Sequence, residues 1–519
     1  MSVTKEAGIP DELLQFLRSP GGHSLIVKGA AGTGKTTFAL QLAEELGDGP
    51  RSYYMSVRVS DASLYRQFPW LLEKRATVTS HRLQGAIPTS TYDPHDEPGR
   101  DATKGPPPLR VDRTELQKLE GRVEMGQEGD EAYEKVGEGQ VASDTLIFDL
   151  GSDLPEIDLA YDEVERNLPG ATLVLVDSID GLSERYGIMA SKLVNTLQKD
   201  LVEKGNASVV YVLESTGDTR LDYLGDGVLM FRSEEHAGRR LRIMTIEKLR
   251  GTEIRQHKYI YTLKDGRLRA FRNRPPGAPA KARPWEPVPD LAPGVASWGH
   301  AALDHLTGGL HAGAIVALEI DADVPSAFVD GLELGPMCNF ASLGRGVAFV
   351  PARKSTAENM RDWVGVHLRD GAFDEHVRVF ESSPLGSMEG SKNALHMEGS
   401  NVDTDLKWSN VEYRLPGSKH PFLSFLAFDT LESVYGDSVL EQMTGHLSSL
   451  RRSRDILIGH VSPMTKSTQK LANMAHVHLK VQNVNGSILL FGQKPYTELF
   501  NLSFSENHNA PWMVLTPIV

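Results

Sequence analysis

Nine residues near the start of the chain form a phosphate-loop motif, which constrains the fold more than any other segment. The motif has the pattern G-x-x-x-x-G-K-[ST] with one further threonine, and its residues are Gly29, Ala30, Ala31, Gly32, Thr33, Gly34, Lys35, Thr36 and Thr37. It follows an apolar run at 24–27 and precedes a stretch in which Phe38, Leu42 and Leu46 repeat at helical spacing. A strand, this loop and a helix in succession let backbone N–H groups and a helix N-terminus surround phosphate groups. The sequence therefore predicts a nucleotide site, with Lys35 on the β- and γ-phosphates and the Thr36 hydroxyl on Mg²⁺.

Length, charge and cysteine content set the broad class. The chain has 519 residues, more than one ordinary hydrophobic core supports, so we expect at least two domains. Its net charge of −14 disfavours a nucleic acid partner, and Cys338, the only cysteine, excludes a disulfide framework and a cysteine zinc cluster. The first ten residues lack the apolar core of a secretory signal, and no run approaches the about 18 apolar residues of a membrane helix. We expect a cytoplasmic protein with no membrane partner.

The first half of the chain alternates between strand and helix patterns, which predicts an α/β domain with a mainly parallel sheet over residues 1–272. Residues 86–143 are rich in proline and acidic residues and poor in large apolar ones, so we expect a long mobile insertion there. The expected strands are 24–28, 52–57, 145–149, 171–177 and 208–213, followed by a β-rich section at 240–246, 259–263 and 268–271.

A second α/β domain is expected at 295–519, after a proline-rich linker at 273–294 that carries seven prolines. The two halves look like tandem copies, because each has an apolar strand that ends in Asp and a small hydroxyl residue: Asp177-Ser178 and Asp429-Thr430. The expected strands of this domain are 314–320, 346–350, 377–380, 423–429 and 455–459, followed by a β-rich end from 476 to 504.

Asp177 is the second predicted residue of the nucleotide site. It follows four apolar residues, which places a carboxylate at the C-terminal end of a central strand, where ligands of α/β sheets bind. There it can hold Mg²⁺ beside Thr36. Capping of the helix that follows is the alternative role.

Lys248 and Arg250 close a strand in the sequence Lys248-Leu249-Arg250-Gly251. Two cations that alternate around one apolar residue fit an ordinary solvated edge strand. They also fit catalytic cations of the arginine-finger type, which would reach the γ-phosphate bound by a neighbouring subunit of a homo-oligomer.

Four segments together resemble the KaiC-like branch of the RecA superfamily: the phosphate loop, 173–178, 224–228 and 248–251. Within that branch, 56–60, 198–204 and 246–251 are most similar to the archaeal GvpD-like gas vesicle ATPases. The resemblance implies two tandem RecA-like P-loop NTPase domains, ATP and Mg²⁺ as ligands, and regulation through protein partners. In the gas-vesicle case it implies repression through a transcriptional activator, and for the subunits it implies an oligomer, with a ring among the possible arrangements.

The chain departs from this family in its hydrolytic base. The family usually has a glutamate after the second strand, whereas residues 53–61 contain none and Arg58 occupies the neighbourhood. Glu214, at the end of the strand 208–213, is a substitute, and Asp180 and Glu184 are two others. All three also fit surface or structural roles.

The second half departs further. Residues 303–313 resemble the entry pattern of KaiC repeats, but the loop after 314–320 is Asp321-Ala322-Asp323-Val324-Pro325-Ser326-Ala327, without a G-K-[ST]. Two carboxylates there would repel a triphosphate. The Lys-Leu-Arg-Gly segment is also missing, since 491–496 take its place. We therefore expect a degenerate copy that binds no nucleotide and in which Asp429 is structural.

These features predict an ATP-binding, slowly hydrolysing regulatory protein. Three alternatives stay open: a RecA/RadA-like DNA-dependent ATPase, a nucleotide-sensing pseudo-ATPase with negligible turnover, and a KaiC-like autokinase. The absent glutamate favours the second, whereas the charge of −14 and the short, non-basic stretch 183–189 disfavour the first.

Overall fold

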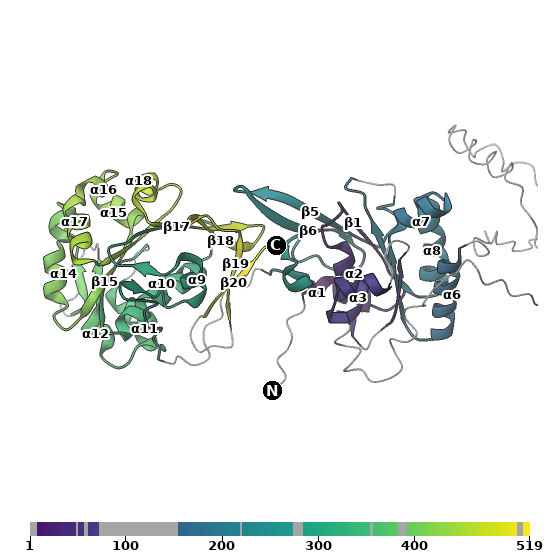
Figure 1. Ribbon diagram of the computed structural model, residues 1–519, viewed down its shortest axis with the longest axis horizontal. Coiled ribbons are helices and arrows are strands. Elements are labelled where there is room, and N and C mark those ends of the chain that lie inside the picture. Colours follow the sequence, from purple (N-terminus) through teal and green to yellow (C-terminus); the bar gives the residue numbers. More distant parts are fainter. Residues whose placement is uncertain are drawn as a thin grey trace, which may run out of the picture.

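The chain forms two α/β domains that lie side by side along the long axis of the molecule (Figure 1). The computed structural model describes residues 8–47, 50–56, 61–71, 154–217, 221–272, 284–352, 356–381, 392–505 and 512–519. Of these, residues up to 272 form the first domain and residues from 284 form the second. The predicted strand 145–149 and insertion 86–143 lie outside the described residues.

The first domain contains one sheet with the strand order β2-β3-β4-β1-β5-β6-β7-β8. Its first five strands are parallel, and β6, β7 and β8 continue it antiparallel. The strands are β1 Ser24–Gly29, β2 Arg51–Ser56, β3 Thr172–Asp177, β4 Ser208–Leu213, β5 Gly227–His236, β6 Arg239–Leu249, β7 Lys258–Thr262 and β8 Arg269–Ala270.

Helices cover both faces of this sheet. Their bounds are α1 Asp11–Arg18, α2 Lys35–Leu46, α3 Asp61–Gln67, α6 Pro155–Asn167, α7 Ile179–Tyr186 and α8 Ala190–Leu197, with a π-helix at Gln198–Lys204 and a 3-10 turn at Lys264–Gly266. Because side chains alternate along a strand, Leu25 and Val27 pack with α1 and α2, while Ile26 packs with α6, α7 and α8. This explains why the strands read as continuous apolar runs in the sequence.

The second domain contains a sheet with the order β14-β13-β12-β15-β16-β11-β17-β18-β19-β20. Seven strands from β14 to β17 are parallel, and the last three are antiparallel. The strands are β11 Ile315–Ile320, β12 Arg345–Val350, β13 Val377–Glu381, β14 Ala394–His396, β15 Lys419–Ala427, β16 Ile456–Val461, β17 Val477–Val484, β18 Ser487–Lys494, β19 Phe500–Ser505 and β20 Trp512–Pro517, beside a small pair β9 Val295–Ala296 and β10 Leu310–His311.

Helices also flank the second sheet. They are α9 Ala301–Thr307, α10 Ser326–Ser342, α11 Ala357–Val364, α12 Ala372–His376, α13 Val402–Asp405, α14 Trp408–Arg414, α15 Phe428–Tyr435, α16 Val439–Gln442, α17 Thr444–Ser453 and α18 Thr468–Met474, with a 3-10 turn at Gly365–His367. Among the described residues, no helix is long and apolar enough to cross a membrane.

The two sheets repeat the same strand order. Starting from β12, the order β12-β15-β16-β11-β17-β18-β19-β20 matches β2-β3-β4-β1-β5-β6-β7-β8 position by position, and the second sheet adds β13 and β14 at its edge. The predicted fold class, two tandem RecA-like domains with mainly parallel sheets, is confirmed. The exact domain boundaries stay a prediction.

Two expectations about individual strands are wrong. β5 is absent from the predicted strands, because its first five residues are buried and the rest lie at the surface, so no single periodicity marks it. The strand expected to reach Asp429 ends at Ala427, and Asp429 lies in the first turn of α15. Phe428 starts the helix early because its ring packs where Gly459 leaves room on β16. Asp429 therefore does not occupy the strand-end position of Asp177.

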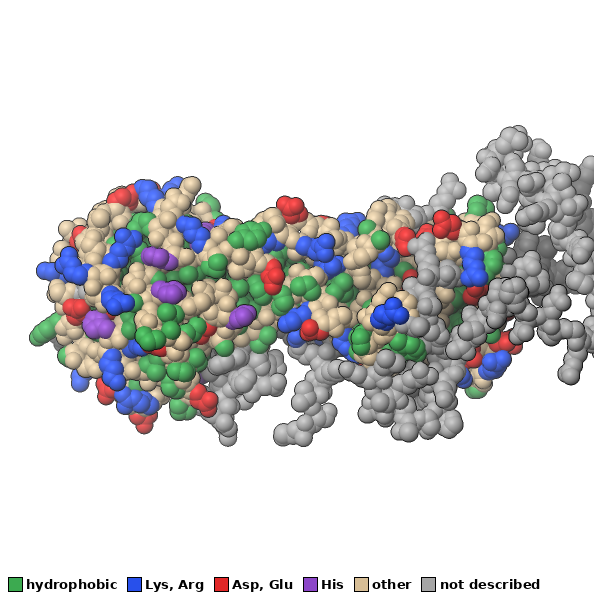
Figure 2. All heavy atoms as spheres, in the orientation of Figure 1, with side chains coloured by type: hydrophobic (Ala, Val, Ile, Leu, Met, Phe, Trp, Pro, Cys, Tyr) green, Lys and Arg blue, Asp and Glu red, His purple; other side chains and the backbone are tan. Residues whose placement is uncertain are grey.

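The C-terminus lies between the two domains (Figure 1). On the face drawn in Figure 2, Lys and Arg side chains alternate with Asp and Glu side chains over both domains. The visible surface therefore shows charges of both signs mixed together.

Candidate functional site

The phosphate loop connects β1 to α2 at the C-terminal edge of the parallel strands, as the sequence predicts. Two of its glycines are required by geometry. Gly34 has a φ of 95°, and a side chain there would come within 2.9 Å of Leu263. A Cβ on Gly29 would lie 2.4 Å from the carbonyl oxygen of Phe231 on β5. The loop thus adopts its shape in close contact with the neighbouring strands.

The ammonium of Lys35 lies within the loop. It donates to the carbonyl oxygens of Gly29 at 2.7 Å and Ala30 at 2.9 Å, and the residue is almost fully buried. Thr33 adds a second internal bond, because its hydroxyl donates to Ala30 at 2.8 Å. The loop therefore holds its cation where the backbone turns, which is the position that a bound phosphate requires.

Thr36 and Asp177 meet although they are 141 residues apart in the sequence. The Thr36 hydroxyl donates to Oδ2 of Asp177 at 2.7 Å. This contact arises because β1 and β3 are both parallel to β4, which lies between them, so the first turn of α2 and the end of β3 share one edge. A hydroxyl and a carboxylate side by side are oxygen ligands of the kind that Mg²⁺ prefers.

Tyr54 is a residue of this site that sequence reasoning missed. Its hydroxyl donates to the same Oδ2 atom of Asp177 at 3.0 Å. Burial first, and the charge of Asp177 second, raise the pKa of Tyr54 far above its ordinary value, so the tyrosine stays a hydrogen-bond donor. Its position on β2 was the available signal. The strand register pairs Tyr54 with Leu175, two residues before Asp177 on β3, and only the side-chain hydrogen bond shows that the hydroxyl reaches Asp177.

The residues present fit ATP and Mg²⁺. In the part of the chain that the structure describes, no group of three or more His, Cys, Asp or Glu side chains could hold a metal by itself. A magnesium ion at Thr36 and Asp177 would therefore take its remaining ligands from phosphate oxygens and water, which is its usual way of binding beside nucleotides. Lys35 supplies the complementary cation for the phosphates.

The candidate bases lie near this edge of the sheet. Glu214 directly follows β4 and is exposed, and its backbone N–H donates to Oδ2 of Asp180 at 2.7 Å. Glu184 is exposed in α7. The structure thus brings Glu214 and Asp180 together, and the assignment of Glu214 as a base stays a prediction. Arg58 lies outside the described residues.

Lys248 and Arg250 lie at the opposite edge of the sheet from the phosphate loop of their own chain. In the strand register, Gly29 pairs with Phe231 on β5, whereas Lys248 pairs with Val228, three residues earlier. That separation along a strand is roughly 10 Å. The two residues therefore lie at a distance from the site that Lys35 and Thr36 form in the same chain.

A short loop, residues 221–226, binds both of these cations. Lys248 Nζ donates to the carbonyls of Gly225 at 2.6 Å and Asp222 at 3.4 Å. Arg250 pairs with Asp226 at 3.1 Å, and its side chain is 59% exposed. Partial burial, together with the charge of Arg250, lowers the pKa of Lys248. Arg250 is thus the more accessible of the two.

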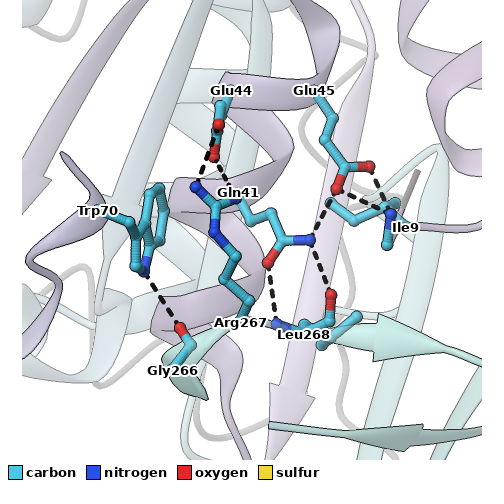
Figure 3. Close-up of polar contacts among 9 residues, drawn as sticks. Ile9, Gln41, Glu44, Glu45, Trp70, Gly266, Arg267 and Leu268 are labelled. Carbon is cyan, nitrogen blue, oxygen red and sulfur yellow. Dashed lines mark hydrogen bonds and ion pairs between the residues drawn. The ribbon is translucent and has the colours of Figure 1, made fainter. Parts of the chain in front are cut away.

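The helix after the phosphate loop is fixed by a cluster of polar contacts at its C-terminal end (Figure 3). Gln41 bonds both backbone groups of Leu268, donating at 2.7 Å and accepting at 2.9 Å. Arg267 pairs with Glu44 at 2.7 Å and lies over the ring of Trp70, whose indole donates to Gly266. These contacts hold α2 against the segment that links β7 to β8.

Two residues behind the loop were also missed. Tyr261 on β7 donates its hydroxyl to the carbonyl of Thr33 at 2.5 Å, and Arg242 on β6 donates to the carbonyl of Gly32 at 3.1 Å. The alternating pattern of 240–246 and 259–263 placed both residues on strands. It contained no information on which strand faces would lie behind the phosphate loop.

Two family models match the first domain. Residues 13–93 match the model described as GvpD gas vesicle protein, P-loop domain, and residues 149–273 match the KaiC ATPase model. The first domain is thus similar to the P-loop domains of GvpD proteins and to the ATPase domain of KaiC. The expected resemblance is thereby confirmed, and the two matched ranges contain Lys35 and Asp177 respectively.

The similarity to GvpD proteins extends over nearly the whole chain. Protein GvpD2 of Halobacterium salinarum is 23% identical over 530 residues, which span 99% of this chain and 97% of that protein. Protein GvpD1 of the same organism is 22% identical over 576 residues, spanning 98% and 96%. The second domain is therefore part of the arrangement that this chain shares with these relatives.

Proposed function

We propose that the first domain binds ATP with Mg²⁺, hydrolyses it slowly, and uses the nucleotide state to regulate a protein partner. The observation that carries this proposal is the 2.7 Å contact between Thr36 and Asp177 beside the buried ammonium of Lys35. These three groups come from two elements far apart in the sequence, since Lys35 and Thr36 begin α2 and Asp177 ends β3, and they meet at the edge where P-loop proteins bind nucleotide.

Each residue has a distinct part in this proposal. Lys35 exchanges its loop carbonyls for the β- and γ-phosphate oxygens, and Thr36 and Asp177 hold the metal. Magnesium, when bound, neutralises negative charge on the phosphate oxygens. Tyr54 fixes the Asp177 carboxylate through the 3.0 Å hydrogen bond and so orients it towards Thr36. Glu214 is the base that positions water in this proposal.

Lys248 and Arg250 act in trans in this proposal. Their place at the far edge of the sheet separates them from the phosphate loop of their own chain, so a neighbouring subunit must supply the nucleotide that they reach. A homo-oligomer, with a ring as one arrangement, satisfies this requirement. Arg250 is the principal group, because its guanidinium is the more exposed and presents a planar fork of N–H donors that matches phosphate oxygens.

The second domain is proposed to support assembly or partner binding rather than nucleotide binding. Glu319 is the penultimate residue of β11, and the penultimate residue of the corresponding strand β1 is Lys28. The Glu319 carboxylate accepts hydrogen bonds from His478 and Lys480 at 2.9 Å each. Burial, followed by the charges of Asp323 and Glu319, raises the pKa of Asp321 in the loop that follows. A loop with this acidic character disfavours a triphosphate.

Gas-vesicle regulation is the process that we propose to test first. Both relatives carry the GvpD name, and the matching P-loop model is described as a gas vesicle protein.

ATP turnover as a function of protein concentration tests the biochemical part. We expect activity per subunit to rise with concentration, Lys35→Ala to abolish ATP binding, and Arg250→Ala to retain binding but lose at least about tenfold in turnover. Arg255 is an exposed arginine in the connection between β6 and β7, and Arg255→Ala is the matched control that should turn over like wild type.

Four results would change the proposal. Normal ATP binding by Lys35→Ala would remove the nucleotide site, and concentration-independent activity that survives Arg250→Ala would remove the trans contact. Binding without phosphate release would favour a nucleotide-sensing pseudo-ATPase. Strong stimulation by single-stranded DNA would favour the RecA/RadA-like alternative, which the mixed surface charge in Figure 2 does not favour.

A further inference from the structure

The two domains are joined by an apolar interface built from the antiparallel parts of both sheets. Eight side chains from the two domains are nearly completely buried in one cluster: Leu241, Ile243, Ile260 and Phe271 from the first, and Leu489, Phe491, Leu499 and Ile518 from the second. Arg239 adds a polar clamp, since its guanidinium donates to Gly492 at 2.7 Å and lies over the ring of Tyr496. An apolar interface of this kind favours a fixed domain arrangement over free hinge motion.

The end of the second domain reaches the back of the phosphate loop through this interface. Residues 517–519, the last residue of β20 and the two that follow it, are called the docking segment below, and they bond two residues of the first domain. The Thr262 hydroxyl donates to the carbonyl of Pro517 at 2.7 Å and accepts the Val519 N–H at 3.3 Å. Arg242 donates from Nε to the main-chain oxygen of Val519 at 2.5 Å.

Arg242 bonds the docking segment and the phosphate loop at the same time. While Nε bonds Val519, Nη1 of the same guanidinium donates to the carbonyl of Gly32 at 3.1 Å. The side chain is almost completely buried. The rigid, planar guanidinium of Arg242, called the Arg242 fork below, therefore links the docking segment to the phosphate loop. If either the docking segment or the loop moves far, one of the two hydrogen bonds must break.

The bond to Gly32 bears on phosphate binding because of peptide geometry. In a planar trans peptide the C=O and N–H point in opposite directions, so a donor that holds the Gly32 carbonyl also aims the Thr33 N–H away from Arg242. Tyr261 acts in the same way on the next peptide, since it holds the Thr33 carbonyl and thereby aims the N–H of Gly34. Loops of this type bind phosphates with such backbone N–H groups.

We propose that Arg242 is a positioning residue that couples nucleotide binding in the first domain to docking of the second domain. The docked segment 517–519 holds the Arg242 fork, and the fork holds the phosphate loop in its binding shape. By reciprocity, bound nucleotide must tighten the docking segment by the same factor. The degenerate domain thus acts on the phosphate loop without binding nucleotide itself. This inference rests on the proposed binding of ATP.

Amide hydrogen exchange of peptides covering 512–519 is the direct test, with and without saturating ATP and Mg²⁺. We expect bound nucleotide to slow exchange of these amides at least about threefold in the wild-type chain. An unchanged exchange rate in a chain that demonstrably binds ATP would overturn the coupling and leave the proposed function intact. Failure to bind ATP at all would overturn both.

Variants separate the coupling from the charge and from general packing. Arg242→Lys keeps the cation but replaces the fork with a single ammonium, and Thr262→Val keeps the shape while removing its bonds to the docking segment. Each should weaken ATP binding about five- to tenfold and abolish the nucleotide effect on exchange. Because both act through the docking segment, the double variant should be no worse than the stronger single one.

Two control variants separate coupling between the domains from a direct effect on ATP binding. Tyr261→Phe removes a bond to the phosphate loop from within the first domain, so it should weaken ATP binding and keep the effect of nucleotide on exchange. Arg240→Lys changes an exposed residue of β6 and should change neither. Additive effects of Arg242→Lys and Thr262→Val, or full coupling in Arg242→Lys, would contradict the proposed fork.

Discussion

Replacing Lys28 with methionine should strongly destabilise the first domain. The Lys28 side chain is completely buried in β1, one residue before the phosphate loop, and its ammonium pairs with Asp222 at 2.7 Å and Glu247 at 2.9 Å. Burial alone lowers the pKa of Lys28, but the two carboxylates outweigh it, so that its pKa lies above the usual value. Methionine keeps the apolar stem and removes the charge.

The size of the effect follows from the exposure of the two partners. Removing one member of a buried ion pair costs about 3–5 kcal/mol, because the other member stays behind without compensation. The side chains of Asp222 and Glu247 are 22% and 27% exposed, so water screens part of their repulsion. We therefore expect the lower end, about 3 kcal/mol. This is a large part of the about 5–15 kcal/mol that stabilises a typical domain.

Urea unfolding at pH 7, followed by hydrogen exchange of peptides from β1 and β5, measures the first domain separately from the second. This pH is suitable because the pKa of Lys28 is higher in the folded chain than in the unfolded chain. The stabilisation from its ion pairs is therefore complete below the pKa of the unfolded chain, and it is lost only at alkaline pH above that value. The matched control is the triple variant Lys28→Met, Asp222→Asn, Glu247→Gln, which removes all three charges and should recover most of the stability. A loss below about 1 kcal/mol for Lys28→Met, or a triple variant as unstable as the single one, would refute this reasoning.

Two further predictions concern buried polar side chains elsewhere. Gln41→Leu removes the side-chain partner of both backbone groups of Leu268, so it should lower the free energy of unfolding in urea by about 2–3 kcal/mol. The ATP dissociation constant should change less than about twofold, because the phosphate loop keeps its own contacts. A large loss of ATP affinity would argue against this. His300 is fully buried beside α10, and burial lowers its pKa to about 4, against a weaker opposing hydrogen bond to Gly331. Because the unfolded chain binds this proton near pH 6.5, the stabilisation is complete above that pH and falls by about 3 kcal/mol towards pH 4. Comparing the urea midpoints of wild type and His300→Gln at pH 7 and pH 5 tests this, and equal losses in both proteins would contradict it.

The candidate nucleotide site shows which features sequence reasoning could predict. The phosphate loop depends on contiguous residues, since its glycines, Lys35 and Thr36 act through local backbone geometry, and the structure places them as expected. Asp177 was predictable because a buried strand that ends in a carboxylate has only one edge at which to present it. In the second domain the same pattern misled, because the packing of Phe428 starts α15 early and moves Asp429 off the strand.

The sequence by itself determined the local chemistry of the phosphate loop, the apolar strands around it and the loss of the motif in the second half. The tertiary structure alone decided what surrounds the site. Tyr54 meets Asp177, Arg250 lies at the opposite edge, and Arg242 spans from Gly32 to Val519 only through strand register and domain docking. The physical reason is sequence distance: a motif is set by neighbours along the chain, whereas contacts between residues hundreds of positions apart depend on how two complete sheets pack.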